Sequence, residues 1–337
     1  METKILGKDF KVSAIGLGCM GMTHGFGDAS NQKEMIEVIR KAYQEGITMF
    51  DTAECYQGID SQGNKLYNED LLGEALRIYP RDSYQIATKC GIKVVNGQQV
   101  LDARPEVIRD SLANSLKRLK TEYVDLYYLH RVDPNTPIEV VAKTMKELMA
   151  EGKIKHWGLS EAGNETIKKA HAICPLTVVE SEYSMMFRDP ERNGLLKTLE
   201  ELNIGFVPFA PLGKGFLTGT VDVNQTFPAN DTRSKQPRFK PENMKVNQVL
   251  LDLIKSIAAK KNATPAQIAL AWVMAKASWI VPIPGSRKLS RIKENIEATN
   301  IKLTAQELME INEMLDKMEL KAERWDLDSP NAKRVGK

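Results

Sequence analysis

Short apolar runs alternate with segments of helical periodicity along almost the whole chain of 337 residues. The helical segments include 31–45, 104–119, 137–151 and 194–202. Such alternation is typical of βαβ units, because parallel strands need a crossover connection. Eight βα units suffice to close a barrel, so we predict a single (β/α)8 (TIM) barrel domain over residues 1–337. The eight strand candidates are 14–19, 48–51, 85–89, 124–130, 156–160, 178–182, 205–210 and 279–283.

Four further segments are predicted outside the βα units: a hairpin, a long insertion, a C-terminal helix and a polar tail. Residues 4–13 form a β-hairpin that caps its floor. A long insertion separates the seventh and eighth strands, and it starts with a polar, proline-containing stretch at 221–241. Such an insertion on the active face of a barrel commonly forms a lid or binding loop. Helices are expected at 246–261 and 265–275 and again at 304–318, followed by a polar tail at 319–337.

The bulk composition argues against several classes of partner. The net charge is only +3, and basic residues are interspersed with acidic ones, so no nucleic-acid footprint is expected. No apolar run approaches 18 residues, which predicts no membrane span. The N-terminus lacks the apolar region of a signal peptide, so we expect a cytoplasmic protein, either a monomer or a small homo-oligomer. The four cysteines lie too far apart in sequence for a zinc motif.

Three successive strand candidates end in an acid, a lysine and a histidine, namely Asp51, Lys89 and His130, and Tyr56 follows the first of them. Taken singly, each has a structural explanation, such as a helix cap or a satisfied core histidine. In a parallel barrel, however, all the carboxyl ends of the strands open onto one face, where the chemistry of such folds takes place. We therefore expect the four side chains to converge in one pocket.

Together these residue types suit delivery of a proton to a carbonyl oxygen. A tyrosine holds its proton until about pH 10, and a neighbouring ammonium is expected to lower that pKa. Asp51 would keep Lys89 charged and oriented, and His130 would position the carbonyl oxygen. No metal site is predicted, because His130 has no second histidine at ligand spacing, so a metal-dependent hydrolase is disfavoured.

Two glycine-rich stretches are not expected to act as independent nucleotide motifs. Residues 16–21 match the dinucleotide pattern Gly-x-Gly-x-x-Gly, but no helical pattern follows directly. The pattern requires a helix N-terminus at that point, so a Rossmann fold is disfavoured. Residues 213–215 likewise lack the Ser/Thr and the spacing of a triphosphate-binding loop.

From the hairpin to Ala298 the chain resembles the aldo-keto reductase family. The segment His130-Arg131-Val132-Asp133-Pro134 is similar to the bacterial, fungal and plant subgroup that acts on small aldehydes and pyridoxal-type substrates. The motifs that carry the resemblance are Ile15-Gly16-Leu17-Gly18, Phe50-Asp51-Thr52-Ala53 with Tyr56, Ala87-Thr88-Lys89, Asp125-Leu126-Tyr127-Tyr128-Leu129-His130, Trp157-Gly158-Leu159-Ser160 and Pro282-Ile283-Pro284-Gly285-Ser286-Arg287.

The resemblance implies NADPH-dependent reduction of aldehydes or ketones, with Tyr56 as general acid, Asp51 and Lys89 tuning it and His130 placing the carbonyl. It also implies an NADPH/NADP⁺ site. Arginine at the 2′-phosphate favours NADPH over NADH. An alternative is a cofactor-sensing regulatory subunit with slow residual reductase activity. The implied cofactor residues are Ser160 and Glu180 (carboxamide), Phe209 (ring), Leu212, Gly213, Lys214 and Gly215 (pyrophosphate), Gly285, Ser286, Arg287 and Arg291 (2′-phosphate), and Glu294 and Asn295 (adenine).

Three positions depart from the family's usual residues: Glu180 replaces glutamine, Glu161 replaces asparagine and Phe209 replaces tyrosine. A carboxylate beside the nicotinamide attracts the positive oxidised ring, so we hypothesise that Glu180 tilts binding toward NADP⁺. Residues 20–26, 92–104 and 221–239 are expected to line the substrate pocket. The physiological substrate is not readable from the sequence.

Two further hypotheses concern charge and redox chemistry on the expected active face. Arg131 and Arg238 are candidates to accept an anionic substrate. Cys19, Cys55 and Cys90 fall at strand ends near that face, and buried filler is the favoured explanation for them. The competing hypothesis is that these thiols make the activity sensitive to oxidation.

Overall fold

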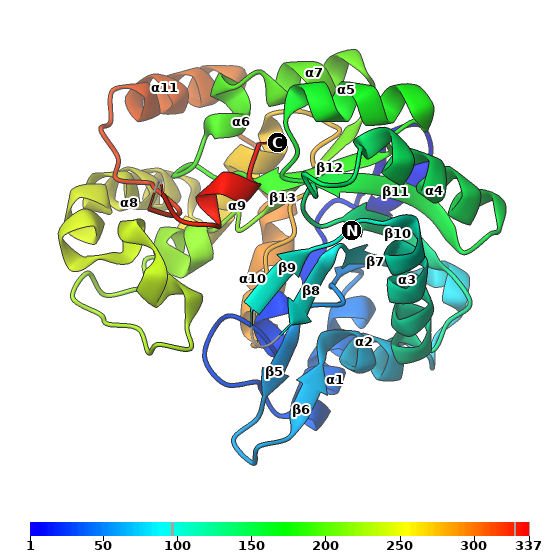
Figure 1. Cartoon of the computed structure of the whole chain (residues 1–337). Helices are drawn as coiled ribbons and strands as arrows, with labels where there is room; N and C mark the ends of the chain where they lie inside the picture. The colour runs from blue at the N-terminus through cyan, green and yellow to red at the C-terminus, as the bar shows by residue number, and fades with distance from the viewer. Residues whose placement is uncertain (96–97, 327, 337) are drawn as a thin grey trace.

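A parallel sheet that curves into a barrel forms the centre of the computed structural model, which describes residues 1–95, 98–326 and 328–336. Seven hydrogen-bonded strands follow the order β13-β12-β11-β10-β7-β4-β3 (Figure 1). Their chain order around the sheet is what successive right-handed βαβ units produce. The strands are β3 (Leu17–Gly18), β4 (Met49–Asp51), β7 (Gln85–Cys90), β10 (Val124–Leu129), β11 (Ile154–Ser160), β12 (Val178–Glu182) and β13 (Gly205–Phe209).

The eighth strand position closes the barrel without being a regular strand. The backbone N–H groups of Val281 and Ile283 each donate to a β13 carbonyl at 3.0 Å, and Gly16 donates to the Pro282 carbonyl at 3.0 Å on the other side. Parallel bridges join Gly18 to Gly285 and Phe206 to Ile280. Pro282 and Pro284 have no N–H group to donate, so the ladder is interrupted. The expected (β/α)8 barrel is confirmed, with this correction to its last strand.

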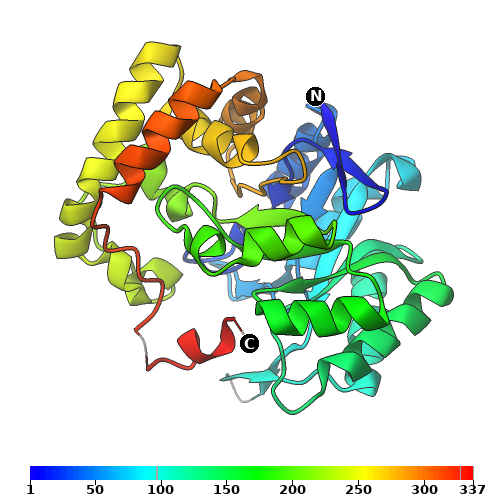
Figure 2. The same ribbon diagram turned by 90° about the horizontal axis from the view of Figure 1, so that it is seen from above.

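Eleven helices lie in the described parts of the chain, most of them packed around the barrel (Figures 1 and 2). Side chains at their first turns explain where several begin. Asn31 caps α1, while Thr264 and Thr304 form capping boxes at α9 and α11. The helices are α1 (Gln32–Gln44), α2 (Asn68–Leu76), α3 (Pro105–Leu119), α4 (Ile138–Ala150), α5 (Asn164–Ile173), α6 (Asp189–Arg192), α7 (Leu195–Glu201), α8 (Pro241–Lys261), α9 (Pro265–Ala275), α10 (Leu289–Glu297) and α11 (Ala305–Asp316).

The floor of the barrel is plugged by the expected N-terminal hairpin, β1 (Thr3–Leu6) with β2 (Phe10–Ser13). Leu6 and Phe10 belong to the apolar cluster of the barrel interior. A Cβ at Gly205 would lie 2.6 Å from the Cβ of Leu6, so this close approach requires glycine. The hairpin therefore fixes the closed end, and the opposite end is left for the loops that follow the strands.

Loops and short elements crowd the open end. They include the antiparallel pairs β5 (Gln57–Ile59) with β6 (Lys65–Tyr67) and β8 (Ile92–Val95) with β9 (Gln98–Leu101). The insertion after β13 reaches across the pocket, since Thr232 N donates to Gly25 O at 2.9 Å. The remaining short elements are η1 (Met20–Met22), η2 (Arg81–Ser83), η3 (Gly213–Thr218), η4 (Thr232–Lys235), η5 (Pro237–Phe239), η6 (Ala298–Asn300) and η7 (Ala332–Arg334).

The C-terminal segment returns to the same end instead of extending away as a simple polar tail. In Figure 2 it runs from α11 to the β8–β9 pair. Arg334 Nη2 donates to Gln99 O at 2.8 Å, and Gly336 N donates to Glu161 O at 2.9 Å. Within the three described ranges, no helix combines the length and the apolar character that crossing a membrane requires.

Candidate active site

A pocket of about 880 Å³ lies at the carboxyl ends of the strands. Every residue of the predicted site lines it except Lys89, which is buried behind the wall, and Gly213, which precedes the lining residues of η3. The residues that the structure brings together here are Asp51, Tyr56, His130, Ser160, Glu180, Phe209, Leu212, Lys214, Gly215, Gly285, Ser286, Arg287, Arg291, Glu294 and Asn295.

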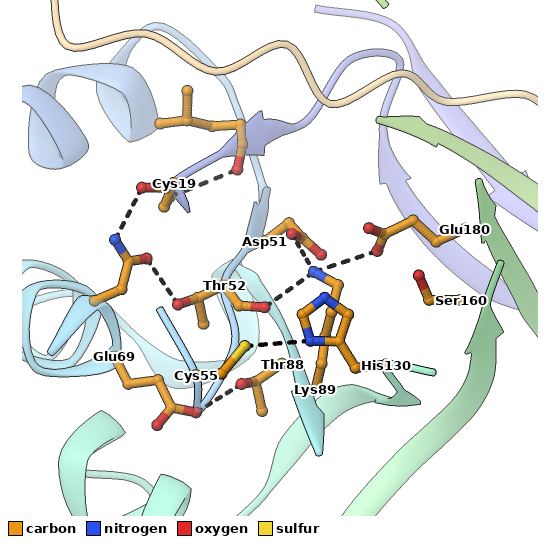
Figure 3. A network of polar contacts seen from close by, with 12 residues as sticks. Cys19, Asp51, Thr52, Cys55, Glu69, Thr88, Lys89, His130, Ser160 and Glu180 are labelled. Carbon is orange, nitrogen blue, oxygen red and sulfur yellow. Dashed lines mark hydrogen bonds and ion pairs between the residues drawn. The ribbon is translucent and has the colours of Figure 1, made fainter. Parts of the chain in front are cut away.

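Lys89 is the centre of a buried polar network at the pocket floor (Figure 3). Its Nζ donates to Asp51 Oδ1 and, at 3.0 Å, to Thr52 O, and Glu180 Oε2 lies 3.3 Å away. Burial alone would lower the pKa of Lys89, but Asp51 and Glu180 outweigh it and raise that pKa. The lysine is therefore an ammonium held between two carboxyl groups.

Glu180 faces this ammonium from β12. Burial and the like charge of Asp51 raise the pKa of Glu180 to about 8, against the attraction of Lys89. Burial also raises the pKa of Asp51, against the charge and the hydrogen bond of Lys89. Asp51 is the closer partner of the ammonium, so we assign the ionised carboxylate to Asp51 and the proton at neutral pH to Glu180.

Tyr56 is buried and follows β4 as expected, but its pKa differs from the expectation. Burial raises the pKa of Tyr56, and the opposing effect of Lys89 does not overcome it. The Lys89 Nζ lies 5.4 Å from the centroid of the Tyr56 ring. The expected lowering by the Lys89 ammonium is present, but the desolvation of a buried phenolate outweighs it, so the net pKa of Tyr56 lies above its ordinary value. Tyr56 keeps its proton.

His130 stands edge-on to Tyr56, with ring centroids 5.7 Å apart. Burial lowers the pKa of His130 well below its usual value, so the imidazole is neutral. Its Nδ1 lies 3.4 Å from Cys55 Sγ, a contact that sequence reasoning missed. Burial raises the pKa of Cys55 to about 12, so this sulfur carries a hydrogen that it can donate to Nδ1. That arrangement leaves the imidazole hydrogen on Nε2.

The opposite end of the pocket is built for an anion. Lys214, Arg287, Lys288 and Arg291 line it together with the backbone of η3 and the start of α10. Burial and repulsion from Arg238 lower the pKa of Lys214 to about 7. Arg287 donates to the carbonyls of Gly21 and Phe26, so it also clamps the loop after β3. A pocket with cations at one end and a proton-handling group at the other fits a phosphorylated dinucleotide such as NADPH.

Backbone geometry supports the same fit. Gly215 has φ 98° and Lys214 has φ 54°, so η3 turns sharply at the pocket edge. A Cβ on Gly285 would lie 2.7 Å from Gly18 O, so the two backbones approach too closely for any side chain. The glycines predicted for the cofactor site therefore have conformational reasons to be glycine.

Arg238 does not reach the pocket, which corrects its proposed role in accepting an anionic substrate. It is 1% exposed and donates through Nη1 to Glu182 at 2.5 Å. Arg131 does line the pocket, and its Nη1 donates to His130 O at 2.6 Å and to Ser160 Oγ at 3.1 Å. Of the two arginines, only Arg131 stays a candidate for a substrate anion.

Glu161, the second unusual acid, lies outside the pocket lining and secures the C-terminal segment. Its Oε2 accepts from Arg324 Nη1 at 2.5 Å, and its Oε1 accepts from Glu182 N at 2.9 Å. Arg324 Nε lies 2.7 Å from Glu182 Oε2, so Arg324 bridges two carboxylates. Together with Arg238, these residues form a buried charged cluster, which we call the Arg324 cluster; Arg324 and Glu182 line the pocket, and Glu161 and Arg238 lie behind them.

The Arg324 cluster brings C-terminal residues into the pocket wall that sequence reasoning missed. The sequence signal that was available for this placement is Trp325, which stands beside Arg324 in an otherwise polar tail. The segments expected at 20–26, 92–104 and 221–239 also contribute to the wall, through Met20, His24, Phe26, Ile92, Gln99, Thr232 and Arg233. The tail residues are Arg324, Trp325, Asn331, Arg334 and Val335.

The cysteines are poorly suited to oxidation. All four are buried and unpaired by disulfides, and burial raises the pKa of both Cys55 and Cys90 to about 12. Because the thiolate is the species of cysteine that peroxide attacks, we expect dilute hydrogen peroxide to leave the four cysteines of the folded protein unmodified. Mass spectrometry after alkylation in denaturant measures this, with urea-unfolded protein as the reactive control. Sulfenic acid at Cys55 in the folded protein would restore the redox hypothesis.

No group of His, Cys, Asp and Glu residues in the described ranges has an arrangement that could hold a metal ion. The proton-handling side chains at one end of the pocket and the cations at the other favour polar organic chemistry with an anionic cofactor.

Comparisons with known proteins identify relatives of this chain in sequence and in fold. A model of the Aldo/keto reductase family matches residues 14–316. The "Probable aldo-keto reductase 1" of Glycine max is 43% identical over 305 residues, covering 90% of this chain and 86% of that protein. The glycerol dehydrogenase AKR11B4 from Gluconobacter oxydans has a TM-score of 0.84 and 27% identity, covering 94% of this chain and 96% of that chain. The thermostable aldo-keto reductase Tm1743, solved with the inhibitor epalrestat, has a TM-score of 0.73 and 28% identity, covering 93% and 100% respectively.

Proposed function

The chain belongs to the aldo/keto reductase family, and from this premise we propose that it reduces aldehydes or ketones to alcohols with NADPH. The observation that carries the proposal is the buried contact of Lys89 with Asp51 beside a protonated Tyr56, in one pocket with a neutral His130. An ammonium beside a phenol stabilises the phenolate that proton donation leaves behind.

The roles of the four residues follow from their protonation states. The bound cofactor supplies a hydride to the carbonyl carbon. Tyr56 gives its hydroxyl proton to the carbonyl oxygen, and Lys89, kept charged by Asp51, stabilises the phenolate. We assign the imidazole hydrogen of His130 to Nε2, from which it donates to the same oxygen, with Cys55 Sγ as the donor to Nδ1.

We assign the cofactor along the pocket from the acidic floor to the cationic end. Ser160 and Glu180 would hold the nicotinamide carboxamide, and Phe209 would stack on the ring. The η3 backbone from Leu212 through Gly213 and Lys214 to Gly215 would bind the pyrophosphate. The 2′-phosphate would meet Gly285, Ser286, Arg287 and Arg291, and the adenine would meet Glu294 and Asn295.

Consumption of NADPH with a panel of small aldehydes, ketones and a pyridoxal-type compound tests the proposal. Turnover is expected for several members of the panel. The similar Gluconobacter protein is named a glycerol dehydrogenase, so the reverse assay with small alcohols and NADP⁺ belongs in the same panel. Tight NADPH binding without turnover in either direction would instead favour the cofactor-sensing regulatory role.

Replacement of Arg291 by alanine is expected to weaken NADPH binding about ten- to hundredfold while leaving NADH binding unchanged. Hydrogen bonds to a charged group are worth about 1.5–3 kcal/mol, and only NADPH carries the 2′-phosphate. Cofactor fluorescence measures both affinities. Lys293→Ala is the matched control, because Lys293 lies on the same helix but pairs with Glu45 at 2.8 Å, outside the pocket. Equal weakening of NADH and NADPH in Arg291→Ala would refute the 2′-phosphate assignment.

A further inference from the structure

The pocket floor holds two carboxyl groups for one ammonium. Asp51 and Glu180 both contact Lys89, and all three side chains are at most 4% exposed. Figure 3 shows the two carboxyl groups converging on Nζ from different strands. With both acids ionised, this trio would carry one negative charge too many in a poorly solvated site. Burial of an uncompensated charge is costly, so the site favours a state in which that charge is removed.

The surroundings of Glu180 offer little to offset the extra charge. Tyr56 and Tyr128 face it as neutral phenols, since the pKa of each is raised by burial first of all. Val207 pairs with Glu180 from β13 and brings no charge. Arg131, two residues after the end of β10, also acts on Glu180 as a cation, and it does so more weakly than Lys89.

Two buried carboxyl oxygens of this network also bear on the charge of Glu180. Asp51 Oδ2 and Glu180 Oε2 have no hydrogen-bond partner among the residues that the structure describes, although Glu180 Oε2 is in ion-pair range of Lys89. The Tyr128 hydroxyl, on the neighbouring strand β10, is likewise unpartnered in those residues. Buried polar atoms are normally satisfied, so these atoms mark a place where a proton or a ligand charge is expected.

We propose that Glu180 couples the redox state of the cofactor to a proton: it is protonated when the uncharged reduced ring occupies the pocket and ionised when the positively charged oxidised ring does. The inference rests on the proposed function, because it requires a nicotinamide beside Glu180. It makes Glu180 a positioning and specificity-determining residue for the choice between the two redox forms.

With this role of Glu180, the protons that carbonyl reduction consumes are supplied by side chains inside the pocket. The carbonyl gains a hydride on carbon and the Tyr56 proton on oxygen, which reduces it by two electrons to the alcohol and leaves the cofactor oxidised. Lys89 passes a proton from Nζ to the Tyr56 phenolate and takes one from the Glu180 carboxyl group. One carboxyl O–H bond breaks and one phenol O–H bond re-forms, so Glu180 ends as the carboxylate that faces the new positive ring.

A pH-dependent preference between cofactor forms follows. The pKa of Glu180, about 8 without cofactor, rises further with the neutral ring bound and falls with the positive ring bound. Between these two pKa values, raising the pH favours NADP⁺ over NADPH; outside that window the two complexes carry the same number of protons and the ratio is flat. One linked proton gives at most about a tenfold change in the ratio of dissociation constants per pH unit. The 2′-phosphate is common to both forms, so its own titration cancels in the ratio.

The experiment measures the dissociation constants of NADPH and NADP⁺ by fluorescence from pH 6 to pH 9, without substrate. In the wild type, the ratio of the NADPH constant to the NADP⁺ constant is expected to rise with pH. Glu180→Gln, which keeps the shape and removes the charge, is expected to flatten the ratio. Glu54→Gln is the matched control, since Glu54 pairs with Lys93 at 2.8 Å and does not line the pocket, and it should keep the wild-type slope.

A second readout needs no cofactor. Because folding raises the pKa of Glu180 from 4.5 to about 8, the ionised acid destabilises the fold increasingly across that pH window and fully above it. Glu180→Gln should therefore melt higher than the wild type at pH 9 by a larger margin than at pH 5. An equal margin at both pH values overturns the buried titration on which the inference depends.

The outcomes separate this inference from the proposed function. A wild-type ratio that is flat with pH, or a slope that persists in Glu180→Gln, overturns the role of Glu180 while leaving the reductase intact. Failure of both cofactor forms to bind the wild type overturns both proposals together. Binding with the expected slope but without turnover would retain the role of Glu180 and remove the reductase.

Discussion

Tyr56→Phe is expected to lower kcat for aldehyde reduction by about 10²–10⁴-fold, the usual contribution of a positioned general acid. The phenyl ring fills the same space but has no proton to give. Since Tyr56 makes no ion pair with Lys89 and no charge is removed, the cationic end of the pocket stays intact and NADPH affinity should be nearly unchanged. Steady-state kinetics with one aldehyde, together with a fluorescence titration of NADPH, measures both quantities.

Tyr127→Phe is the matched control for that result. Tyr127 is likewise a buried tyrosine, but it lies on β10. Its hydroxyl donates to Ile108 O at 3.3 Å, on the helical side of the barrel. Loss of that hydrogen bond costs roughly 1 kcal/mol of stability and should leave kcat unchanged. If Tyr56→Phe turns over as fast as Tyr127→Phe, the proton comes from another group, and Tyr56 serves only to shape the pocket.

The placement of the polar strand ends was predictable because it depends on a periodic rule. Once eight βα units are recognised, Asp51, Lys89 and His130 must open onto one face, whatever the details of packing. The glycines and cations of the loops after the seventh and eighth strand positions were named from the family resemblance, and most of them line the same pocket. The irregular closure at residues 279–285 was harder to foresee, because it depends on which N–H groups the two prolines remove.

The errors share a different cause, which is long-range packing. Arg238 is separated from Glu182 by 56 residues, and Arg324 is separated from Glu161 by 163 residues. No local pattern reports such a pairing, so the sequence offers Arg238 as a candidate for a substrate anion and shows residues 319–337 only as a polar tail. The net pKa shift of Tyr56 was hard to predict for a related reason. Its direction depends on how completely the site is desolvated, which only the assembled barrel determines.

Arg324→Met is expected to lower the free energy of unfolding by about 3–5 kcal/mol, because removing one partner of a buried ion pair strands the other. Arg324 is 7% exposed and lies against Glu161 and Glu182, which are at most 2% exposed as side chains. Glu182 retains Arg238, but Glu161 loses its charged partner. Urea denaturation of the full chain measures the change.

Arg109→Met is the matched control, since Arg109 also bridges two carboxylates, Glu147 and Glu151, but at the surface. Exposed pairs contribute about 0–1 kcal/mol, so this variant should unfold close to the wild type. Adding Glu161→Gln to Arg324→Met removes the stranded charge and should recover part of the loss. Equal stability of the two arginine variants would contradict a structural role for the Arg324 cluster.

The Arg324 cluster should also determine the pH at which the protein begins to unfold in acid. Burial alone would raise the pKa of Glu182, but Arg238 and Arg324 outweigh it and lower that pKa to about 2 from 4.5. A depressed carboxylate pKa contributes stability that is present above the unfolded value and is lost as the pH falls through the folded one. The wild type should therefore lose this contribution between pH 4.5 and about pH 2. In Arg324→Met the pKa of Glu182 moves back up, so the acid transition should begin at a higher pH than in the wild type or in Arg109→Met.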